Sequence, residues 1–237
     1  MLDYRRYSTF TFDCYGTLID WETGILNALR PVLQRHGLSL TDDQILEQFG
    51  ELESTAELPP YRTYRDVLST VVEGFGARLG FTATDDDRAA LSESVGDWPA
   101  FPDTAEALQR LARRHRLVII SNVDDDLFAR SALRLPVAFH DVITAQQVGS
   151  YKPNLDNFHF ALRKIDTPVE DVLHVAQSLF HDMEPANKIG LTTVWINRRH
   201  DRPGFGTTPP ASATPVAEFP DLKSFADQVD AAHAAAR

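Results

Sequence analysis

Five short, largely apolar runs are spaced along the chain in a pattern typical of buried parallel strands. They lie at residues 9–12, 117–120, 141–144, 172–176 and 192–196. Strands that are covered on both faces of a sheet need such continuous runs rather than a strict alternation of apolar and polar residues. The pattern therefore predicts a parallel sheet with helices on both sides.

The segments between the later runs have the spacing of amphipathic helices. In residues 103–115, for example, Ala105, Leu108 and Leu111 share one helical face. Strands that alternate with helices predict right-handed crossovers and a doubly wound α/β sheet. In sheets of this kind, ligands bind beyond the carboxyl ends of the strands.

Residues 21–99 interrupt the alternation, because they contain helical patterns and no convincing strand. We expect a helical cap domain inserted after the first strand, with residues 1–20 and 100–237 forming the α/β core domain. Pro31 lies inside one of the helical patterns and is expected to break or kink that helix. Residues 201–215 are rich in proline, glycine and threonine and are expected to form a loop.

Polar residues follow the predicted strands at the edge where a ligand is expected. They are Asp13, Tyr15 and Thr17 after the first run, Ser121 and Asn122 after the second, Lys152 after the third, and Ser178 and Asp182 after the fourth. Because the carboxyl ends of parallel strands meet at one edge, these residues predict a single site.

Four segments resemble, in order, the four motifs of the haloacid dehalogenase superfamily: FDCYGTL, IISN, YKP and HVAQSLFHD. The resemblance covers essentially the whole chain and implies a Rossmann-like core with a helical cap. Most members are magnesium phosphatases with a second acid in the first motif, where this chain has Tyr15. Gln177 replaces a further acid in the fourth motif. The site is then too poor in charge for a firm magnesium site, so we expect no metal and no cofactor.

The first motif is similar to that of the L-2-haloacid dehalogenase branch, in which an aromatic residue precedes Gly-Thr-Leu. This resemblance implies that Asp13 displaces halide from C2 of an L-2-haloacid, and that water then hydrolyses the aspartyl ester to a D-2-hydroxy acid. Lys152 would keep Asp13 ionised, Thr17 would supply a hydroxyl beside it, and Asp182 would position the water.

The resemblance also implies a set of substrate-binding residues. Ser121 and Asn122 would hold the substrate carboxylate, and we add Tyr15 and Ser178 as substrate contacts. Family members carry an arginine on the cap that receives the halide, but the corresponding stretch QFGELEST contains none. Arg62 and Arg65, further along the chain, are the remaining candidates.

Three other functions remain open. Relatives that open the ring of azetidine-2-carboxylate use the same attack at C2, and an amine leaving group needs no halide site. A magnesium-dependent phosphatase of small molecules would be distinguished by its need for the metal. A binding protein without catalysis is disfavoured, because the ordered polar residues at the strand ends would then serve no purpose.

Composition limits the partners and the location. The 237 residues carry a net charge of −11, which disfavours nucleic acid and anionic membranes as partners. The single cysteine, Cys14, excludes an internal disulfide and fits a reducing compartment. No apolar stretch is long enough for a signal peptide at the start of the sequence or for a membrane span further along it. We expect a cytoplasmic enzyme with a small carboxylic-acid substrate, and the resemblance adds a possible homodimer.

Overall fold

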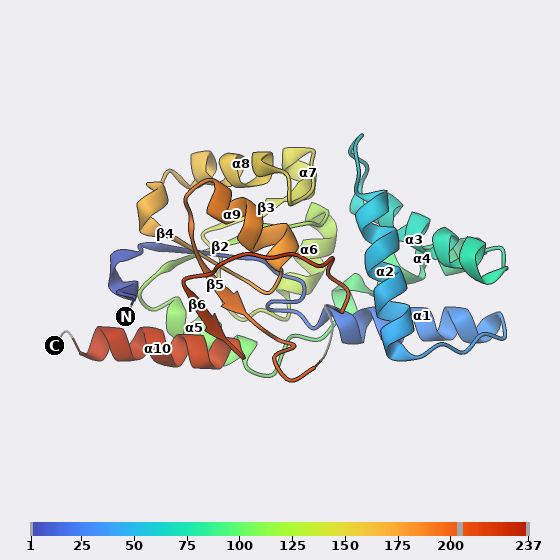
Figure 1. The fold of residues 1–237 in the computed structure, drawn as a ribbon, viewed down its shortest axis with the longest axis horizontal. Helices are drawn as coiled ribbons and strands as arrows, with labels where there is room; N and C mark the ends of the chain where they lie inside the picture. Colours follow the sequence, from blue (N-terminus) through green and yellow to red (C-terminus); the bar gives the residue numbers. More distant parts are fainter. Residues whose placement is uncertain (1, 203–205, 236–237) are drawn as a thin grey trace.

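A computed structural model, which describes residues 2–202 and 206–235, contains a six-stranded parallel sheet between layers of helices (Figure 1). The order across the sheet is β3-β2-β1-β4-β5-β6. The strands are β1 (Thr9–Phe12), β2 (Arg116–Ser121), β3 (Asp141–Thr144), β4 (Val172–Ala176), β5 (Thr192–Ile196) and β6 (Ala217–Phe219). The predicted doubly wound α/β fold is confirmed.

The first five strands coincide with the five apolar runs. β6 was not predicted, because it has only three residues and none of them is fully buried. It pairs with β5 at the edge of the sheet. The loop expected over residues 201–215 contains no helix or strand in its described part, and residues 203–205 lie outside that part.

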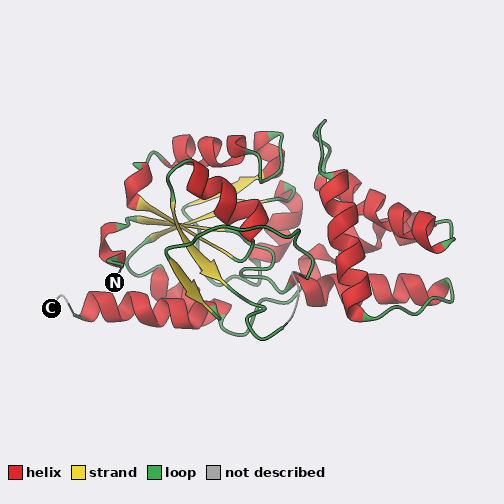
Figure 2. Ribbon diagram, viewed as in Figure 1, coloured by secondary structure: helices red, strands yellow, loops and turns green. Residues whose placement is uncertain are grey.

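Helices cover both faces of the sheet (Figure 2). They are α5 (Thr104–Leu111), α6 (Asp125–Ala132), α7 (Ala145–Val148), α8 (Leu155–Ile165), α9 (Glu184–Lys188) and α10 (Leu222–Ala234). Three short 3₁₀ helices are described, η1 (Tyr4–Arg6), η2 (Val95–Asp97) and η3 (Val169–Asp171), and η4 (Leu179–Met183) is a short π-helix.

Alternate residues of β2 show how the two layers form. Val118 and Ile120 pack in a cluster with Phe158 of α8, on one face of the sheet. Leu117 and Ile119 belong to the larger cluster on the other face, which α5 and α10 cover. Because both faces of the sheet are buried, the residues that point to either face must be apolar. This gives the continuous apolar run.

The chain between β1 and α5 forms the helical insertion, which consists of α1 (Trp21–Arg35), α2 (Asp42–Ala56), α3 (Tyr64–Leu79) and α4 (Asp85–Ser94). Thr41, Thr63 and Thr84 cap the last three of these helices through their side chains. We propose that this insertion is the cap predicted from the sequence.

Pro31 does not break its helix, and the alternative expectation of a kink at this position stays a prediction. α1 runs without interruption from Trp21 to Arg35. Pro31 and Asn27, whose carbonyl loses its helical hydrogen bond to the proline, both lie on the exposed side of α1. Water can therefore bond to that carbonyl, which reduces the cost of the missing N–H.

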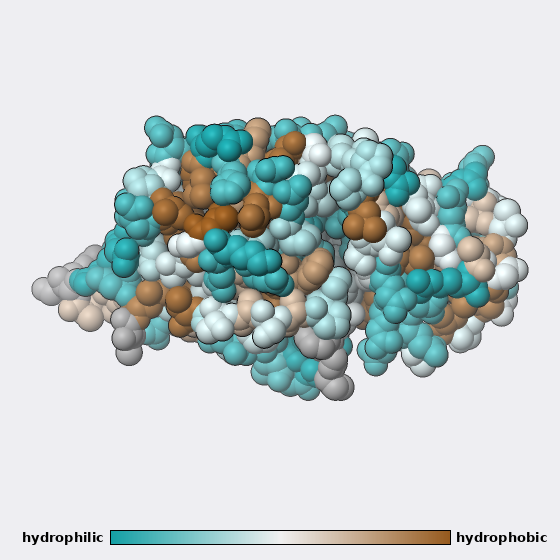
Figure 3. Space-filling view, turned by 45° about the horizontal axis from the view of Figure 1, so that its top comes forward, coloured by the Kyte–Doolittle hydropathy of each residue, from teal (hydrophilic) through white to brown (hydrophobic). Residues whose placement is uncertain are grey.

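The helical insertion lies beside the carboxyl edge of the sheet, and a cleft separates the two parts at the surface (Figure 3). One wall of this cleft belongs to the end of α2 and the residues that follow it, and the other belongs to residues 149–156 and η4. Within the described chain, no helix is both long and apolar enough to cross a membrane.

Candidate active site

Asp13 is the first residue after β1, and its carboxylate is fixed by two donors. Thr17 Oγ1 donates to Oδ2 at 2.7 Å, and Lys152 Nζ donates to Oδ1 at 2.9 Å. Gly16 has φ of +89°, which allows the chain to turn back so that Thr17 reaches Asp13. The Asp13 side chain is 9% exposed, and the two donors hold its carboxylate in one orientation at the floor of a pocket.

Lys152 lies between two carboxylates. Its Nζ donates to Asp182 Oδ1 at 2.7 Å and to the backbone carbonyl of Ile120 at 2.9 Å, in addition to Asp13. The side chains of Lys152 and Asp182 are 2% and 1% exposed. All three donor positions of the ammonium are therefore used, and the group is fully oriented.

A chain of buried hydrogen bonds supports Asp182 from behind. His174 Nε2 lies 3.0 Å from Asp182 Oδ1, and His174 Nδ1 lies 2.9 Å from Thr11 Oγ1. Both His174 and Thr11 project from the central strands β4 and β1. The rigid sheet thus positions the carboxylate that faces Lys152.

Burial and charge act in opposite directions on the three ionisable groups. Burial raises the pKa of Asp13 above its ordinary value, and the Lys152 ammonium opposes that rise. The pKa of Asp182 is lowered, because Lys152 and His174 outweigh the effect of burial. The two carboxylates in turn raise the pKa of Lys152 against its burial. The ammonium is therefore charged at neutral pH.

Two buried polar atoms at the pocket have no hydrogen-bond partner among the described residues. They are Ser121 Oγ and Asp182 Oδ2. Buried polar atoms are rarely left unsatisfied, because the desolvation cost of each is about 1–3 kcal/mol. Both residues line the pocket above Asp13, so a substrate or a water molecule there can satisfy them.

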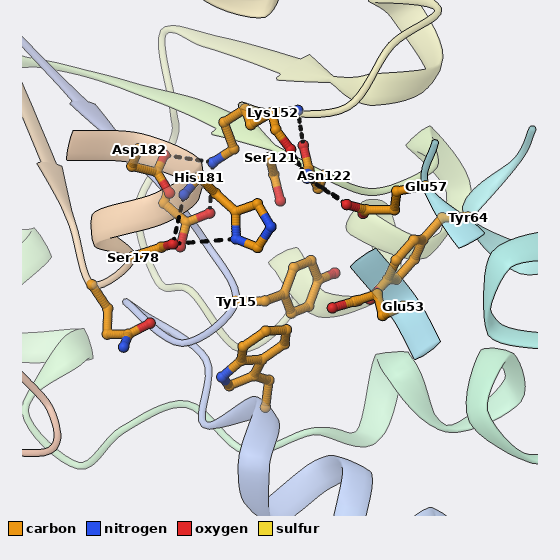
Figure 4. Close-up of a pocket in the computed structure, with 13 residues that line it drawn as sticks. Tyr15, Glu53, Glu57, Tyr64, Ser121, Asn122, Lys152, Ser178, His181 and Asp182 are labelled. Atoms are coloured by element: carbon orange, nitrogen blue, oxygen red, sulfur yellow. Dashed lines mark hydrogen bonds and ion pairs between the residues drawn. The ribbon is translucent and has the colours of Figure 1, made fainter. Parts of the chain in front are cut away.

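The pocket brings together most of the residues predicted from the sequence. It lies between the carboxyl edge of the sheet and the helical insertion (Figure 4). The predicted residues that line it are Asp13, Tyr15, Ser121, Asn122, Lys152, Ser178 and Asp182. Thr17 reaches the same site through its hydrogen bond to Asp13.

Three of these residues are already oriented by neighbours. The Tyr15 hydroxyl lies 2.9 Å from Ser131 Oγ on α6, and Ser178 Oγ lies 3.2 Å from His181 Nδ1. The Asn122 side chain exchanges hydrogen bonds with the backbone of Lys152, which fixes the loop after α7.

Arg62 and Arg65 are not brought to this pocket. Arg62 donates to the carbonyl of Ala56 and to Thr70. Arg65 forms ion pairs with Glu93 and Asp126. Neither arginine lines the pocket, because each is held at the rim of the helical insertion by partners of its own.

The helical insertion contributes pocket residues that the sequence reasoning missed. They are Trp21, Glu53, Glu57 and Tyr64. Glu53 lies inside QFGELEST, the stretch in which an arginine was sought. A signal was present, because Ile45, Phe49 and Glu53 follow each other at four-residue spacing, and the first two are buried. An acid on an apolar stripe indicates a buried acid with a function or a partner.

The residues at the pocket do not fit magnesium as metal ligands. Mg²⁺ requires oxygen ligands in nearly octahedral geometry. Both oxygens of Asp13 already accept hydrogen bonds, and Tyr15 stands where a second acid would be needed. Among residues 2–202 and 206–235, no three histidine, cysteine or acidic residues are grouped so that they could hold a metal ion.

Comparisons with known proteins find similar hydrolases over most of the chain. Residues 7–190 match the family model of the haloacid dehalogenase-like hydrolases. The (S)-2-haloacid dehalogenase 4A of Burkholderia cepacia is 26% identical over 84% of this chain and 86% of its own length. A phosphatase is similar to the same degree: the 5-amino-6-(5-phospho-D-ribitylamino)uracil phosphatase YigB of Escherichia coli is 26% identical over 81% of this chain and 84% of its own.

The fold is also found among solved structures. An L-2-haloacid dehalogenase from Xanthobacter autotrophicus, solved with chloropropionic acid covalently bound, superposes with a TM-score of 0.77. The match covers 94% of this chain and 98% of the other, at 18% identity. This similarity establishes a shared fold across the sheet and the helical insertion.

Proposed function

Because the chain belongs to the haloacid dehalogenase-like hydrolase family, we propose that it hydrolyses a bond at C2 of a small carboxylic acid through an ester on Asp13. The observation that carries the proposal is the buried Asp13 carboxylate, which Thr17 and Lys152 orient toward the pocket. The first candidate substrate is an L-2-haloacid, in view of the (S)-2-haloacid dehalogenases among the relatives.

In the first step, an oxygen of Asp13 forms a bond to C2, and the carbon–halogen bond breaks. Its electron pair leaves with the halide, and the configuration at C2 is inverted. Holding the carboxylate and C2 in line is worth about 7–11 kcal/mol of the barrier. Ser121 Oγ, which has no partner within the described chain, can donate a hydrogen bond to the substrate carboxylate.

In the second step, water attacks the carbonyl carbon of the Asp13 ester. The oxygen of the water stays on Asp13, and the C–O bond between the Asp13 carbonyl carbon and the product oxygen breaks. One proton of the water passes to that oxygen, so that the product leaves as a D-2-hydroxy acid, and the other proton is released to solvent. Asp182 Oδ2 can accept a hydrogen bond from that water, because it is buried and none of the described residues bonds to it. Lys152 stabilises the negative charge that forms on the ester oxygen.

Oxygen-18 water tests the ester directly. Excess enzyme is allowed one turnover with (S)-2-chloropropionate in oxygen-18 water and EDTA, and the peptide that contains Asp13 is analysed by mass spectrometry. We expect the heavy oxygen in Asp13 and not in the product, and halide release in the presence of EDTA.

Two variants complete this test. Asp13→Asn should lose at least about 10⁴-fold in kcat/KM, because the nucleophile is absent. Asp86→Asn, on the exposed first turn of α4, should retain wild-type rates. Heavy oxygen in the first product would contradict the ester. Magnesium-dependent release of phosphate from sugar or nucleotide phosphates would instead establish a phosphatase.

A further inference from the structure

Two glutamates of the helical insertion form the wall of the pocket opposite the sheet. Glu53 lies in the last turn of α2, and Glu57 is its C-terminal capping residue. Figure 4 shows both carboxyl groups pointing into the pocket, toward Tyr15 and Ser121. The Tyr64 hydroxyl donates to Glu53 Oε1 at 2.5 Å, and the Asn122 amide lies 3.3 and 3.4 Å from the two oxygens of Glu57.

Neither glutamate has a cationic partner. In the part of the chain that the structure describes, no lysine or arginine forms an ion pair with Glu53 or Glu57, although Glu53 is only 4% exposed. Asp87, the other deeply buried acid of the insertion, is paired with Arg35 and His36. Buried carboxylates normally require such a partner.

The cation that lines the pocket, Lys152, opposes the rise in the pKa of Glu57 that burial causes, but it forms no ion pair with either glutamate. Lys152 Nζ donates to Asp13, Asp182 and the Ile120 carbonyl, so its three protons are committed on the sheet side. The pocket lining thus has four carboxyl groups and one lysine. A second, independent sign of a missing ligand is the pair of buried atoms without partners at the same pocket, Ser121 Oγ and Asp182 Oδ2.

We propose that Glu53 and Glu57 form a binding subsite for an alkylammonium group of the substrate. The substrate is then a 2-substituted carboxylic acid that carries a protonated nitrogen, with its carboxylate on the Ser121 side of the pocket. This inference rests on the proposed function for the reaction at C2, and it assigns the substrate class. A simple 2-haloacid, which has no positive charge, would leave both glutamates unpaired.

The protonation of the pair fits this role. Burial raises the pKa of Glu53 to about 7, and it raises the pKa of Glu57 well above its ordinary value. Near pH 7 about half of Glu53 therefore carries a proton in the empty pocket, and a bound cation favours the ionised form and displaces that proton. The other titratable groups facing the pair are Asp13, Tyr15, Tyr64, Lys152, His181 and Asp182 in the pocket, with Tyr61, Tyr151 and Asp156 on the cleft side of Glu57.

The nitrogen can take part in the reaction in two ways, which experiment separates. In a strained cyclic amino acid it is the leaving group: the Asp13 oxygen bonds to C2, the C2–N bond breaks, and its electron pair stays on nitrogen. The ring ammonium then becomes a neutral primary amine that keeps both protons. In a haloacid with an amine at the chain end, halide leaves and the nitrogen only binds.

Two ligands that cannot react test the subsite alone. 4-Aminobutanoate and pentanoate have the same chain, with ammonium in one where the other has methyl. By isothermal titration calorimetry, we expect 4-aminobutanoate to bind roughly 10- to 100-fold more tightly, as charge-assisted hydrogen bonds warrant. Titrations in buffers of different ionisation enthalpy should show that its binding releases protons.

Isosteric variants assign the effect to the pair. Glu53→Gln and Glu57→Gln should each remove most of the preference for 4-aminobutanoate. Glu47→Gln, at an exposed position of the same helix, should keep it. Near-ultraviolet circular dichroism checks that each variant is folded. Equal binding of the two ligands by the wild type, or an unchanged preference in both pocket variants, would overturn the subsite.

Turnover separates this inference from the proposed function. (S)-Azetidine-2-carboxylate, 4-amino-2-chlorobutanoate and 2-chloropentanoate are compared in kcat/KM, and the Asp13 peptide is analysed after one turnover. Faster reaction of a nitrogen-bearing substrate with label in Asp13 supports both. Label in Asp13 with no gain from nitrogen would overturn the subsite and leave the proposed function standing. Preferential binding of 4-aminobutanoate without label in Asp13 would support the subsite and overturn the proposed function.

Discussion

The two walls of the pocket are built on opposite principles. On the sheet side, Lys152 is bonded to Asp13 and Asp182, and each charge has an opposite charge within 3 Å. On the insertion side, the hydrogen-bond partners of Glu53 and Glu57 among the described residues are a tyrosine hydroxyl and an asparagine amide. Each charge on the sheet side has an opposite charge within the protein, whereas the carboxyl groups on the insertion side await one from a ligand.

This difference separates chemistry from selectivity. The sheet side contains residues from the four family motifs. They lie near the ends of strands whose residues are almost completely buried. Such a wall can hold a nucleophile in place for any substrate that reaches it. The insertion side decides which substrates reach it, because its two carboxyl groups favour a positive charge and repel an additional negative one.

The largest predicted effect comes from removing the charge that completes the sheet side. Lys152→Met leaves Asp13 and Asp182 buried together without a cation, so the pKa of Asp13 rises further and its ionised fraction falls. We expect kcat/KM to fall about 10³-fold at neutral pH. The acid limb of the pH profile should also move to higher pH.

A surface lysine provides the control for this variant. Lys188→Met removes an exposed ion pair with Glu184 on α9 and should change kcat/KM by less than about twofold. Rate profiles between pH 5 and 9, measured on wild type and both variants, give the result. An acid limb that stays at the wild-type position in Lys152→Met would show that Lys152 does not set the ionisation of Asp13.

An intermediate effect should appear on the insertion side as a dependence on pH. Ionised Glu53 attracts an ammonium, so kcat/KM for 4-amino-2-chlorobutanoate should rise as pH increases through about 7, the pKa of Glu53. For 2-chloropentanoate the sign is reversed, because ionisation then adds only repulsion of the substrate carboxylate.

Glu53→Gln removes the titrating group and should flatten the pH profiles of both substrates. It should change kcat/KM for each of them by roughly tenfold at pH 8. Glu47→Gln serves as the control on the same helix. Parallel profiles for the two substrates in the wild type would mean that Glu53 does not contact the part of the substrate in which they differ.

The two walls also differ in how far the sequence could predict them. Asp13, Ser121 and Lys152 were predicted because each lies at or beyond the carboxyl end of a predicted strand, and these ends meet at one edge of a parallel sheet. The five central strands were equally clear, whereas β6 is too short and too exposed to leave a pattern. These features depend on local sequence and on general rules of topology.

The insertion wall depends instead on how helices dock. The sequence marks Glu53 as a buried acid at most, and only the placement of α2 against the sheet edge shows that Glu53 and Glu57 face the pocket. For the same reason Arg62 and Arg65, which were the remaining candidates for binding an anion, lie outside it. Side-chain charge indicates a candidate, but tertiary packing decides which way the residue faces.

The smallest predicted effect tests whether Tyr64 tunes the insertion wall. Its hydroxyl donates to Glu53, and this hydrogen bond lowers the pKa of Glu53 against the rise caused by burial. Tyr64→Phe should therefore move the limb near pH 7 to higher pH and weaken 4-aminobutanoate binding at pH 7 only a fewfold. The lost hydrogen bond should reduce the free energy of unfolding by about 0.5–1.5 kcal/mol.

Tyr61→Phe is a matched control, because the Tyr61 hydroxyl donates to Asp124 and not to Glu53. If both variants shift the limb equally, the pKa of Glu53 is set by burial in the insertion as a whole, and Tyr64 contributes packing rather than a specific hydrogen bond.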